Sequence, residues 1–385
     1  MTRAIFVLAL TMATGVLFQP VAAQAQWSTQ TEPGQDLSKA KPKPKPAAKT
    51  DPKSKTKQMA RPTQTGPKAL TPNPTADPVS RFSTSLPETA GPKLKSVAPA
   101  SGEDAAYFAF DQGQYLTALD LAERAAAKGD PQAHTLVGRI YAEGLGVGKD
   151  EVVAARWYAR AAELGDTEAA FALGLQLAEG RGIEKDRAAA ANMFEKAAAT
   201  GHPYANYNLG LLFLNGDGKP ENPHRAAMHI TYAAEKGVTA AQYDLAVLYQ
   251  TGHGVQPNAL EAARWMRRAA EQGMVEAEYD YALLLLRGFG LNAEVPKAID
   301  YLRSAADKGF AGAQNRLAHL LIDDAGGRNV QPVESAKWRL LARDSGLKDE
   351  ALDARIGKMS RADRQAAEKA AQEWRDRSSI GMLAQ

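Results

Sequence analysis

The side chains best suited to catalysis or metal binding are scattered through this sequence of 385 residues. The chain has no cysteine, which excludes thiolate zinc sites, thiol nucleophiles and disulfide bonds. No G-x-S-x-G nucleophile elbow is present, and the histidines form no H-E-x-x-H or similar metal spacing. They are His134, His202, His224, His229, His253 and His319. We therefore expect no metal, no cofactor and no enzymatic activity, with carboxylate pairs between distant parts of the chain left open.

Two other patterns are typical of ligand sites. Gly-x-Gly sequences such as Gly144-Leu145-Gly146 precede a predicted helix, where backbone N–H groups can hold a phosphate. They recur in five places without the Lys-Ser/Thr ending of a P-loop, so we interpret them as turns. Asp323 and Asp324 stand beside two glycines, but two adjacent carboxylates fall short of a calcium ligand set. A solvated loop is the better interpretation.

Stronger candidates for binding are polar side chains that recur at intervals of 36 residues, outside the apolar pattern. The first row holds His134, Asn206, Gln242, Glu278 and Gln314. The second row holds Asn208, Asp244, Asp280 and Arg316. In a stack of repeats, such rows are expected to line a concave groove and contact an extended or helical peptide. Tyr207, Tyr243 and Tyr279 form a further row, for which we expect a mainly structural role.

The interval of 36 residues also separates three sets of glycines. The first set is Gly129, Gly165, Gly201, Gly237, Gly273 and Gly309. The second is Gly144, Gly180, Gly216, Gly252 and Gly288, and the third is Gly146, Gly182, Gly218, Gly254 and Gly290. A fixed period of about 20–50 residues is typical of repeat arrays. Such arrays present an extended binding surface rather than one catalytic cleft.

Each unit, counted from Asp130, contains two helical patterns joined by a glycine loop. In the first pattern an alanine is followed four residues later by a large apolar residue, which shares its helical face. The next position is glycine in three units and alanine in three, which predicts close approach of a neighbouring helix. The second pattern contains Ala154-Ala155-Arg156-Trp157 and its equivalents. We expect its tryptophans to fill the space between layers.

The combined signature A-x-x-x-L-G-x-x-Y-x-x-G-x-G and A-A-x-W-x-x-x-A-A-x-x-G resembles the Sel1-like repeat family of tetratricopeptide-type solenoids. The resemblance covers residues 130–346 in six copies. It implies an all-α, right-handed solenoid of about six helix pairs. It also implies a scaffold or adaptor role, often for exported proteins in envelope signalling, secretion or surface assembly. Some members carry paired cysteines and have been considered as enzymes acting on cell-wall-related substrates. This chain has no cysteine, which argues against the enzymatic interpretation.

The repeats are flanked by two shorter segments. Residues 103–129 read as a half-repeat that leads into the first unit, with Tyr107 and Tyr115 among its aromatic residues. After Gly346 the period ends, and residues 347–385 are predicted to form a helical cap and tail. Ser360 is the predicted N-cap of the second helix there.

Residues 1–25 have the features of a secretory signal. Arg3 supplies the positive charge, an apolar stretch follows, and Ala23-Gln24-Ala25 forms a small-x-small cleavage site. An uncleaved membrane anchor is the alternative, but the apolar stretch is shorter than the roughly 20 residues that a span needs. We expect cleavage near Ala25 and a periplasmic or secreted protein.

Residues 26–102 are predicted to be a disordered basic tether, because they contain few large apolar residues. Residues 26–100 hold 13 prolines, 13 basic and 5 acidic residues, a net charge of +8. Contact with a membrane surface or an anionic envelope polymer is one interpretation of this charge, and a solvated spacer is the other. Residues 101–385 hold 33 basic and 39 acidic residues, so we expect no nucleic-acid partner.

These observations favour an exported protein–protein interaction scaffold or adaptor, of which a regulator in the envelope is one concrete form. The partner, a protein or peptide, is expected in the concave groove. The alternative is a cell-envelope polymer-binding protein or hydrolase.

Overall fold

The computed structural model describes residues 105–322 and 330–383, with side chains described as far as residue 378. The predicted signal, the predicted tether and the Asp323–Asp324 pair lie outside the described residues. Within the described ranges the chain forms sixteen helices and no strand. Six central pairs are α3 (Pro131–Glu143) and α4 (Glu151–Glu163), α5 (Thr167–Glu179) and α6 (Arg187–Ala199), α7 (Pro203–Asn215) and α8 (Pro223–Glu235), α9 (Thr239–Thr251) and α10 (Ala259–Glu271), α11 (Val275–Arg287) and α12 (Val295–Asp307), and α13 (Ala311–Ile322) and α14 (Pro332–Asp344). The flanking helices are α1 (Ala105–Asp111), α2 (Tyr115–Ala126), α15 (Glu350–Gly357) and α16 (Arg361–Leu383).

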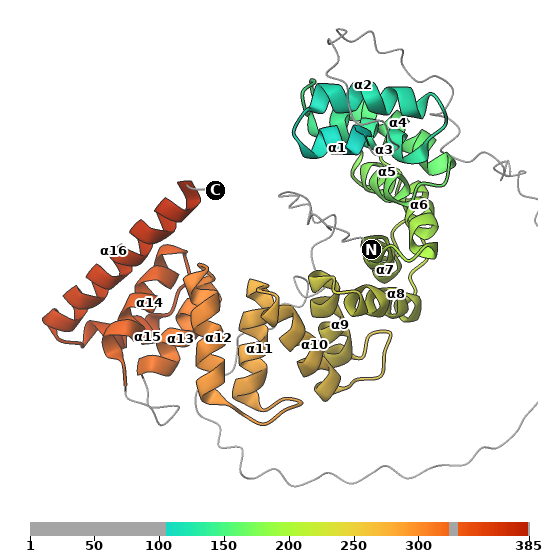
Figure 1. Ribbon diagram of the computed structural model, residues 1–385. Coiled ribbons are helices and arrows are strands. Elements are labelled where there is room, and N and C mark those ends of the chain that lie inside the picture. The colour runs from blue at the N-terminus through green and yellow to red at the C-terminus, as the bar shows by residue number, and fades with distance from the viewer. Residues whose placement is uncertain (1–104, 323–329, 384–385) are drawn as a thin grey trace, which may run out of the picture.

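The helix pairs stack into an open arc. Each first helix packs against its own second helix and against the second helix of the preceding pair. In the middle of the arc, α5, α7 and α9 lie toward the inner side, and α6, α8 and α10 lie toward the outer side (Figure 1). The predicted all-α solenoid is therefore confirmed.

Sequence signals at the helix ends explain where each pair turns. The first helix α3 stops at Gly144, which adopts a left-handed conformation with a φ of 72° and donates its N–H to the Ile140 carbonyl. The second helix α4 starts at Asp150, whose carboxylate accepts hydrogen bonds from the N–H groups of Val152 and Val153, both at 2.9 Å. The Gly-x-Gly sequences are turns, as expected.

The third set of glycines also allows one repeat to contact the backbone of the repeat before it. A Cβ built on Gly182 would lie 2.1 Å from the Glu151 carbonyl oxygen, at the start of the preceding second helix. The same contact would be 2.3 Å between Gly218 and the Arg187 carbonyl oxygen. No side chain fits in this space, so glycine is needed for stacking as well as for turning.

The small residue inside each first helix faces a large residue of its own second helix. A Cβ on Gly174 would lie 2.6 Å from the Phe194 ring, and one on Gly138 would lie 2.8 Å from the Tyr158 ring. In the fifth unit the corresponding residues are Ala282 and the smaller Leu302. The close helix approach predicted from this pattern is therefore present, with glycine opposite the aromatic rings.

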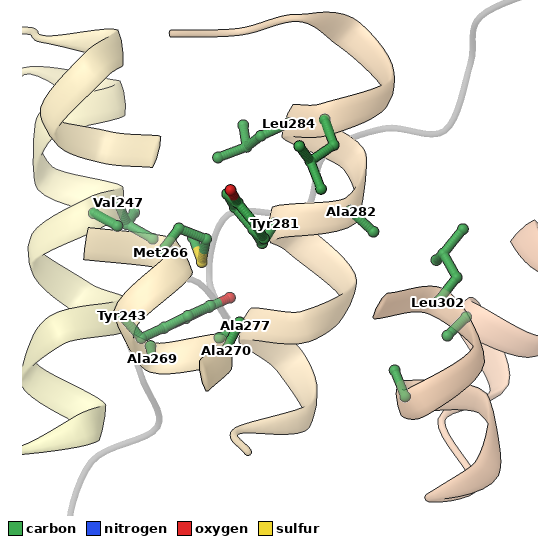
Figure 2. Close-up of a cluster of buried hydrophobic side chains, with 14 of the residues drawn as sticks. Tyr243, Val247, Met266, Ala269, Ala270, Ala277, Tyr281, Ala282, Leu284 and Leu302 are labelled. Atoms are coloured by element: carbon green, nitrogen blue, oxygen red, sulfur yellow. The ribbon is translucent and has the colours of Figure 1, made fainter. Parts of the chain in front are cut away.

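The core runs along the arc as layers between helices. Figure 2 shows one layer, in which Tyr243 of α9, Met266 of α10 and Tyr281 of α11 gather with several alanines. The tryptophans of the second helices lie inside these layers, as expected. Their relative exposures are 6% for Trp157, 8% for Trp265 and 1% for Trp338.

Additional helices close both ends of the array. The N-terminal segment forms a shortened pair, α1 and α2, that packs against α3. At the other end α16 packs along α14, with Arg375 paired to Asp344 at 2.5 Å. Ser360 accepts a hydrogen bond from the Asp363 N–H at 3.1 Å, so it caps α16. None of the helices in the described part of the chain has the length and hydropathy to span a membrane.

The fit between Gly174 and Phe194 can be tested by adding one methyl group. We expect Gly174→Ala to destabilise the protein by about 1–3 kcal/mol, because the new Cβ overlaps a ring in a packed layer. Urea unfolding followed by circular dichroism measures the loss. Adding Phe194→Leu should recover most of it, since that pair reproduces the alanine and leucine of the fifth unit. An unchanged midpoint for Gly174→Ala would show that the layer has spare room.

Candidate partner-binding surface

The first polar row is inside the solenoid, not on its surface. Its members His134, Asn206, Gln242, Glu278 and Gln314 have relative exposures of 3%, 6%, 4%, 5% and 1%. So little exposed surface leaves these side chains no room to line an open groove for a partner. The expectation that this row lines the groove is therefore corrected by burial.

The three buried amides of this row join their own repeats to the preceding repeats. Asn206, Gln242 and Gln314 each donate a side-chain N–H to a carbonyl oxygen eight residues earlier, in the last turn of the preceding second helix. Gln242 and Gln314 do so at 3.1 Å. Each of these carbonyl oxygens also accepts a backbone N–H from the glycine three residues later, so the amide adds a second hydrogen bond that ties the first helix to the end of the preceding second helix.

The two remaining members of the row are also engaged. His134 Nδ1 lies 2.7 Å from the Asp130 carbonyl oxygen, so it donates to its own helix start. The Glu278 carboxylate accepts hydrogen bonds from Ser304 at 2.9 Å and from Lys308 at 2.6 Å. All five positions thus have a structural role that accounts for their polarity.

The second polar row runs from buried to exposed along the arc. Asp244 is 0% exposed and Asn208 is 9% exposed, whereas Asp280 is partly buried and Arg316 is exposed. The Asn208 amide donates to the Tyr204 carbonyl oxygen at 2.8 Å. Only Asp280 and Arg316 therefore offer their side chains to a partner in this conformation, and partner binding by them stays a prediction.

The carboxylates of this row accept hydrogen bonds from the tyrosine row of the preceding repeat. Tyr207 donates to Asp244 at 2.9 Å, and Tyr243 donates to Asp280 at 2.7 Å. We call these two pairs the Tyr–Asp ladder. It links α7 to α9 and α9 to α11. The expected structural role of these two tyrosines is therefore present.

Burial governs the ionisation of the ladder. It raises the pKa of both tyrosines well above the usual value, and the negative charge of the acceptor carboxylate adds to the shift. Burial also raises the pKa of Asp280, while the hydrogen bond from Tyr243 acts in the opposite direction. The tyrosines stay protonated near neutral pH, so the ladder is a set of donors fixed on acceptors rather than a source of general bases.

The first helices, which lie toward the inner side in the middle of the arc, also carry exposed positions one turn before the second row, and the apolar and polar patterns of the repeat do not single these positions out. They are Gln132, Glu168, Tyr204, Ala240, Glu276 and Gly312, and all are exposed or partly exposed. Tyr204 stands out because it is 55% exposed and aromatic where the other units have small or polar residues. The sequence shows this departure from the repeat, and the departure could have identified Tyr204 as a candidate binding residue.

Tyr204 belongs to an aromatic cluster formed with Phe171 and His202. The His202 ring stacks on Phe171 with 4.4 Å between ring centroids, and Tyr204 lies 6.4 Å from Phe171. His202 Nδ1 accepts the Ala205 N–H at 3.0 Å and caps α7. Its other nitrogen then carries the proton and faces Glu168 at 3.3 Å. We call Glu168, Phe171, His202 and Tyr204 the inner aromatic cluster.

The inner aromatic cluster has the chemistry of a recognition surface. The hydrogen bond from His202 lowers the pKa of Glu168, so this exposed carboxylate is ionised near neutral pH. An exposed ring beside a fixed negative charge suits a peptide that carries apolar and basic groups. No group of three or more His, Asp or Glu placed to hold a metal ion occurs among the residues that the structure describes.

The 36-residue helix pairs and their glycine contacts define a solenoid of Sel1 type, and comparison with protein families agrees. The family described as Sel1 repeat matches six consecutive segments. They are residues 112–130, 131–166, 167–202, 203–238, 239–274 and 275–310. The chain belongs to the Sel1 repeat family. The pair α13 and α14 follows the matched segments and continues the stack. Solenoids of this family are typically protein–protein interaction scaffolds.

Solved structures give the same fold. A protective antigen of uropathogenic Escherichia coli that displays an SLR fold is 27% identical with a TM-score of 0.61, over 72% of this chain and 61% of the antigen. The chain thus spans less than two thirds of the antigen's length. A Sel1 repeat protein from Oxalobacter formigenes is 29% identical with a TM-score of 0.55, over 64% of this chain and 96% of that protein. A search of curated proteins gave no match.

The ladder generates a prediction that depends on pH. Tyr243→Phe should cost about 1.5–3 kcal/mol at pH 7, because Asp280 loses the donor that compensates its buried charge. Burial already raises the pKa of Asp280, and loss of the donor raises it further, so the loss should shrink as the pH falls toward the ordinary aspartate value of about 3.9 and the carboxyl group becomes neutral in the folded protein. Urea unfolding at pH 7 and at a pH where the Asp280 carboxyl group is neutral measures the difference in the free energy of unfolding.

The matched control for this prediction is Tyr279→Phe. Tyr279 occupies the same position one repeat later, where the next unit offers Arg316 in place of an aspartate. Its loss should be small and should not follow aspartate titration. A loss from Tyr243→Phe that is equal at both pH values would show that packing, not the charge of Asp280, sets the cost.

Proposed function

We propose that this protein is an exported scaffold that holds another protein or peptide on the inner face of its arc. The observation that carries the proposal is the inner aromatic cluster. Tyr204 exposes 55% of its surface in a layer whose other aromatic rings are largely covered. An aromatic ring left open on a rigid helix is costly to hydrate and provides binding energy when a partner covers it.

The scaffold supports recognition because it holds the cluster in a fixed place. His202 is fixed by its cap hydrogen bond to α7, by its stack on Phe171 and by its contact with Glu168. The cluster therefore loses little conformational entropy on binding. Farther along the inner face, Glu276, Asp280 and Arg316 add charged groups of both signs. This order favours an extended partner that runs along several repeats.

Photo-crosslinking tests the inner face. We expect p-benzoylphenylalanine at position 204 or 276 to form adducts with the partner in cells. The same probe in place of Arg264, which is exposed on the second helix α10, should form none. Mass spectrometry identifies the adducts. Equal adducts at all three positions, or adducts at position 264 alone, would refute the inner face as the binding surface.

We propose export because residues 1–25 carry the three parts of a secretory signal. Expressed in a bacterium with two membranes, the full chain should be found in the periplasm with its N-terminus near residue 26. A chain without residues 1–25 should stay in the cytoplasm. Recovery of the uncleaved chain in the inner membrane would favour the anchor instead.

The basic tether is proposed to contact an anionic envelope surface. Deleting residues 38–58 removes eight lysines and should shift the protein from the envelope fraction to the soluble fraction. Deleting residues 62–82, a segment of equal length with two basic residues, is the matched control. Identical fractionation of both deletions would support a solvated spacer.

A further inference from the structure

A pocket of about 360 Å³ lies beside the second helix α8, between it, the C-terminal end of α6 and the start of α7. Its lining includes Ala199, Asn206, Met228, His229 and Tyr232. The volume lies within the usual range of about 300–1,000 Å³ for ligand sites. Met228 is 61% exposed at the pocket, which makes it one of the most exposed large apolar side chains of the described residues. The outer surface is therefore apolar at this point.

Four lining residues depart from the residues that other repeats place at the same positions. Met228 stands where the other units have Arg156, Asn192, Arg264, Asp300 and Lys337. His229 stands where they have Trp157, Met193, Trp265, Tyr301 and Trp338. Tyr232 stands where they have Arg160, Lys196, Arg268, Ser304 and Leu341. Ala199 stands where they have Glu163, Glu235, Glu271, Asp307 and Asp344.

These four departures meet in one place although they come from two different units. Three of them replace a mostly polar or charged surface position by an apolar or aromatic residue, and the fourth replaces a mostly larger side chain by histidine. Stability of the stack does not account for the first three, because exposed apolar side chains add little to a core. Their convergence at a hollow is typical of a binding site.

The hydrogen bonds around His229 determine what the pocket can recognise. The Asn206 side-chain N–H group donates to the carbonyl oxygens of Ala198 and His202, so the amide oxygen points to His229. His229 Nδ1 lies 2.9 Å from that oxygen and must donate to it. In the neutral ring the proton is therefore on Nδ1, and Nε2 is an acceptor. Burial, with help from Arg225, lowers the pKa of His229, which keeps the ring neutral.

The walls of the pocket are fixed before anything binds. The His229 ring stacks on Phe213 with 5.8 Å between ring centroids and an angle of 8° between ring planes. Tyr232 donates its hydroxyl to the Gly201 carbonyl oxygen at 3.2 Å, and a Cβ on Gly201 would lie 2.7 Å from that hydroxyl. The thioether of Met228 is the adaptable part of the wall. A preformed apolar site with one acceptor selects a flat apolar group with one donor.

We propose that this pocket receives a tryptophan side chain of a partner protein, whose indole N–H donates to His229 Nε2. The repeat itself uses tryptophan at the His229 position in three units, so the layer spacing suits an indole. Histidine leaves part of that volume open. Tryptophan is enriched at interface hot spots, and its buried N–H group needs an acceptor. The inference rests on the proposed scaffold function and adds a second contact on the opposite face of the arc.

The probe for a test is N-acetyltryptophanamide, with its 1-methylindole derivative as the comparison that lacks the N–H donor. Binding to the full chain is followed by NMR of the Met228 methyl group and the His229 ring. We expect saturable shifts of both groups and about 5–10-fold weaker binding of the methylated probe. Absence of saturable shifts, or equal binding of both probes, would overturn the proposal.

Two substitutions restore the residues of other repeats and should close the site. His229→Trp should fill the pocket and abolish probe binding, and Met228→Arg should weaken binding at least fivefold without entering the core. Asp300→Met, at the position equivalent to Met228 in the fifth unit, is the control and should bind the probe like the unaltered chain. Unchanged binding by the folded His229→Trp protein would overturn the proposal, and Met228→Arg keeps the test valid if that protein does not fold.

The chain's own Trp27 is the competing occupant. Tighter probe binding after Trp27→Ala would mean that the N-terminal segment fills the pocket, and would overturn a partner as its occupant. Binding that is the same with and without Trp27 supports the partner. Probe binding needs no partner, so it can succeed while the crosslinks from position 204 fail. The two proposals are thus distinguished.

Discussion

Backbone contact between neighbouring repeats is the constraint on which the rest of the structure depends. Gly182 and Gly218 sit where a Cβ would overlap a carbonyl group of the preceding second helix. This contact sets the distance between repeats at the end of each first helix. At the other end, the buried amides of Asn206, Gln242 and Gln314 hold the last turn of the preceding second helix. The first helices α7 and α9 have both contacts and are thereby fixed to the preceding repeat at both ends.

Most of the fold could be predicted from the sequence because the constraints repeat. A single turn glycine or layer tryptophan is difficult to interpret, but its recurrence every 36 residues assigns it the same place in every unit. For the third glycine set the sequence predicts only turns, since close contact with an earlier repeat depends on the angle between units. That angle is a property of the assembled stack and has no local sequence signal.

The polar rows are harder to interpret for a different reason. A first helix packs on two sides, against its own second helix and against the preceding one, so its buried arc is wide. Nine of the thirteen residues of α7 are buried. Polar residues outside the main apolar stripe, such as Gln242, are expected from the sequence to be exposed but lie in the second contact. The informative positions are those where one unit departs from the others, as Tyr204 and His229 do.

The Tyr–Asp ladder has a mechanical consequence. It joins α7, α9 and α11 through hydrogen bonds to carboxylates, so widening the gaps between these helices breaks a hydrogen bond between a buried carboxylate and its tyrosine donor. Between α3 and the start of α5, the corresponding contact is a threonine hydroxyl on a part-buried helix cap, Thr135 on Asp166 at 2.8 Å. We therefore expect the arc to resist bending more strongly at its centre than at its N-terminal end. A partner that bends it stores elastic energy mainly in the first repeats.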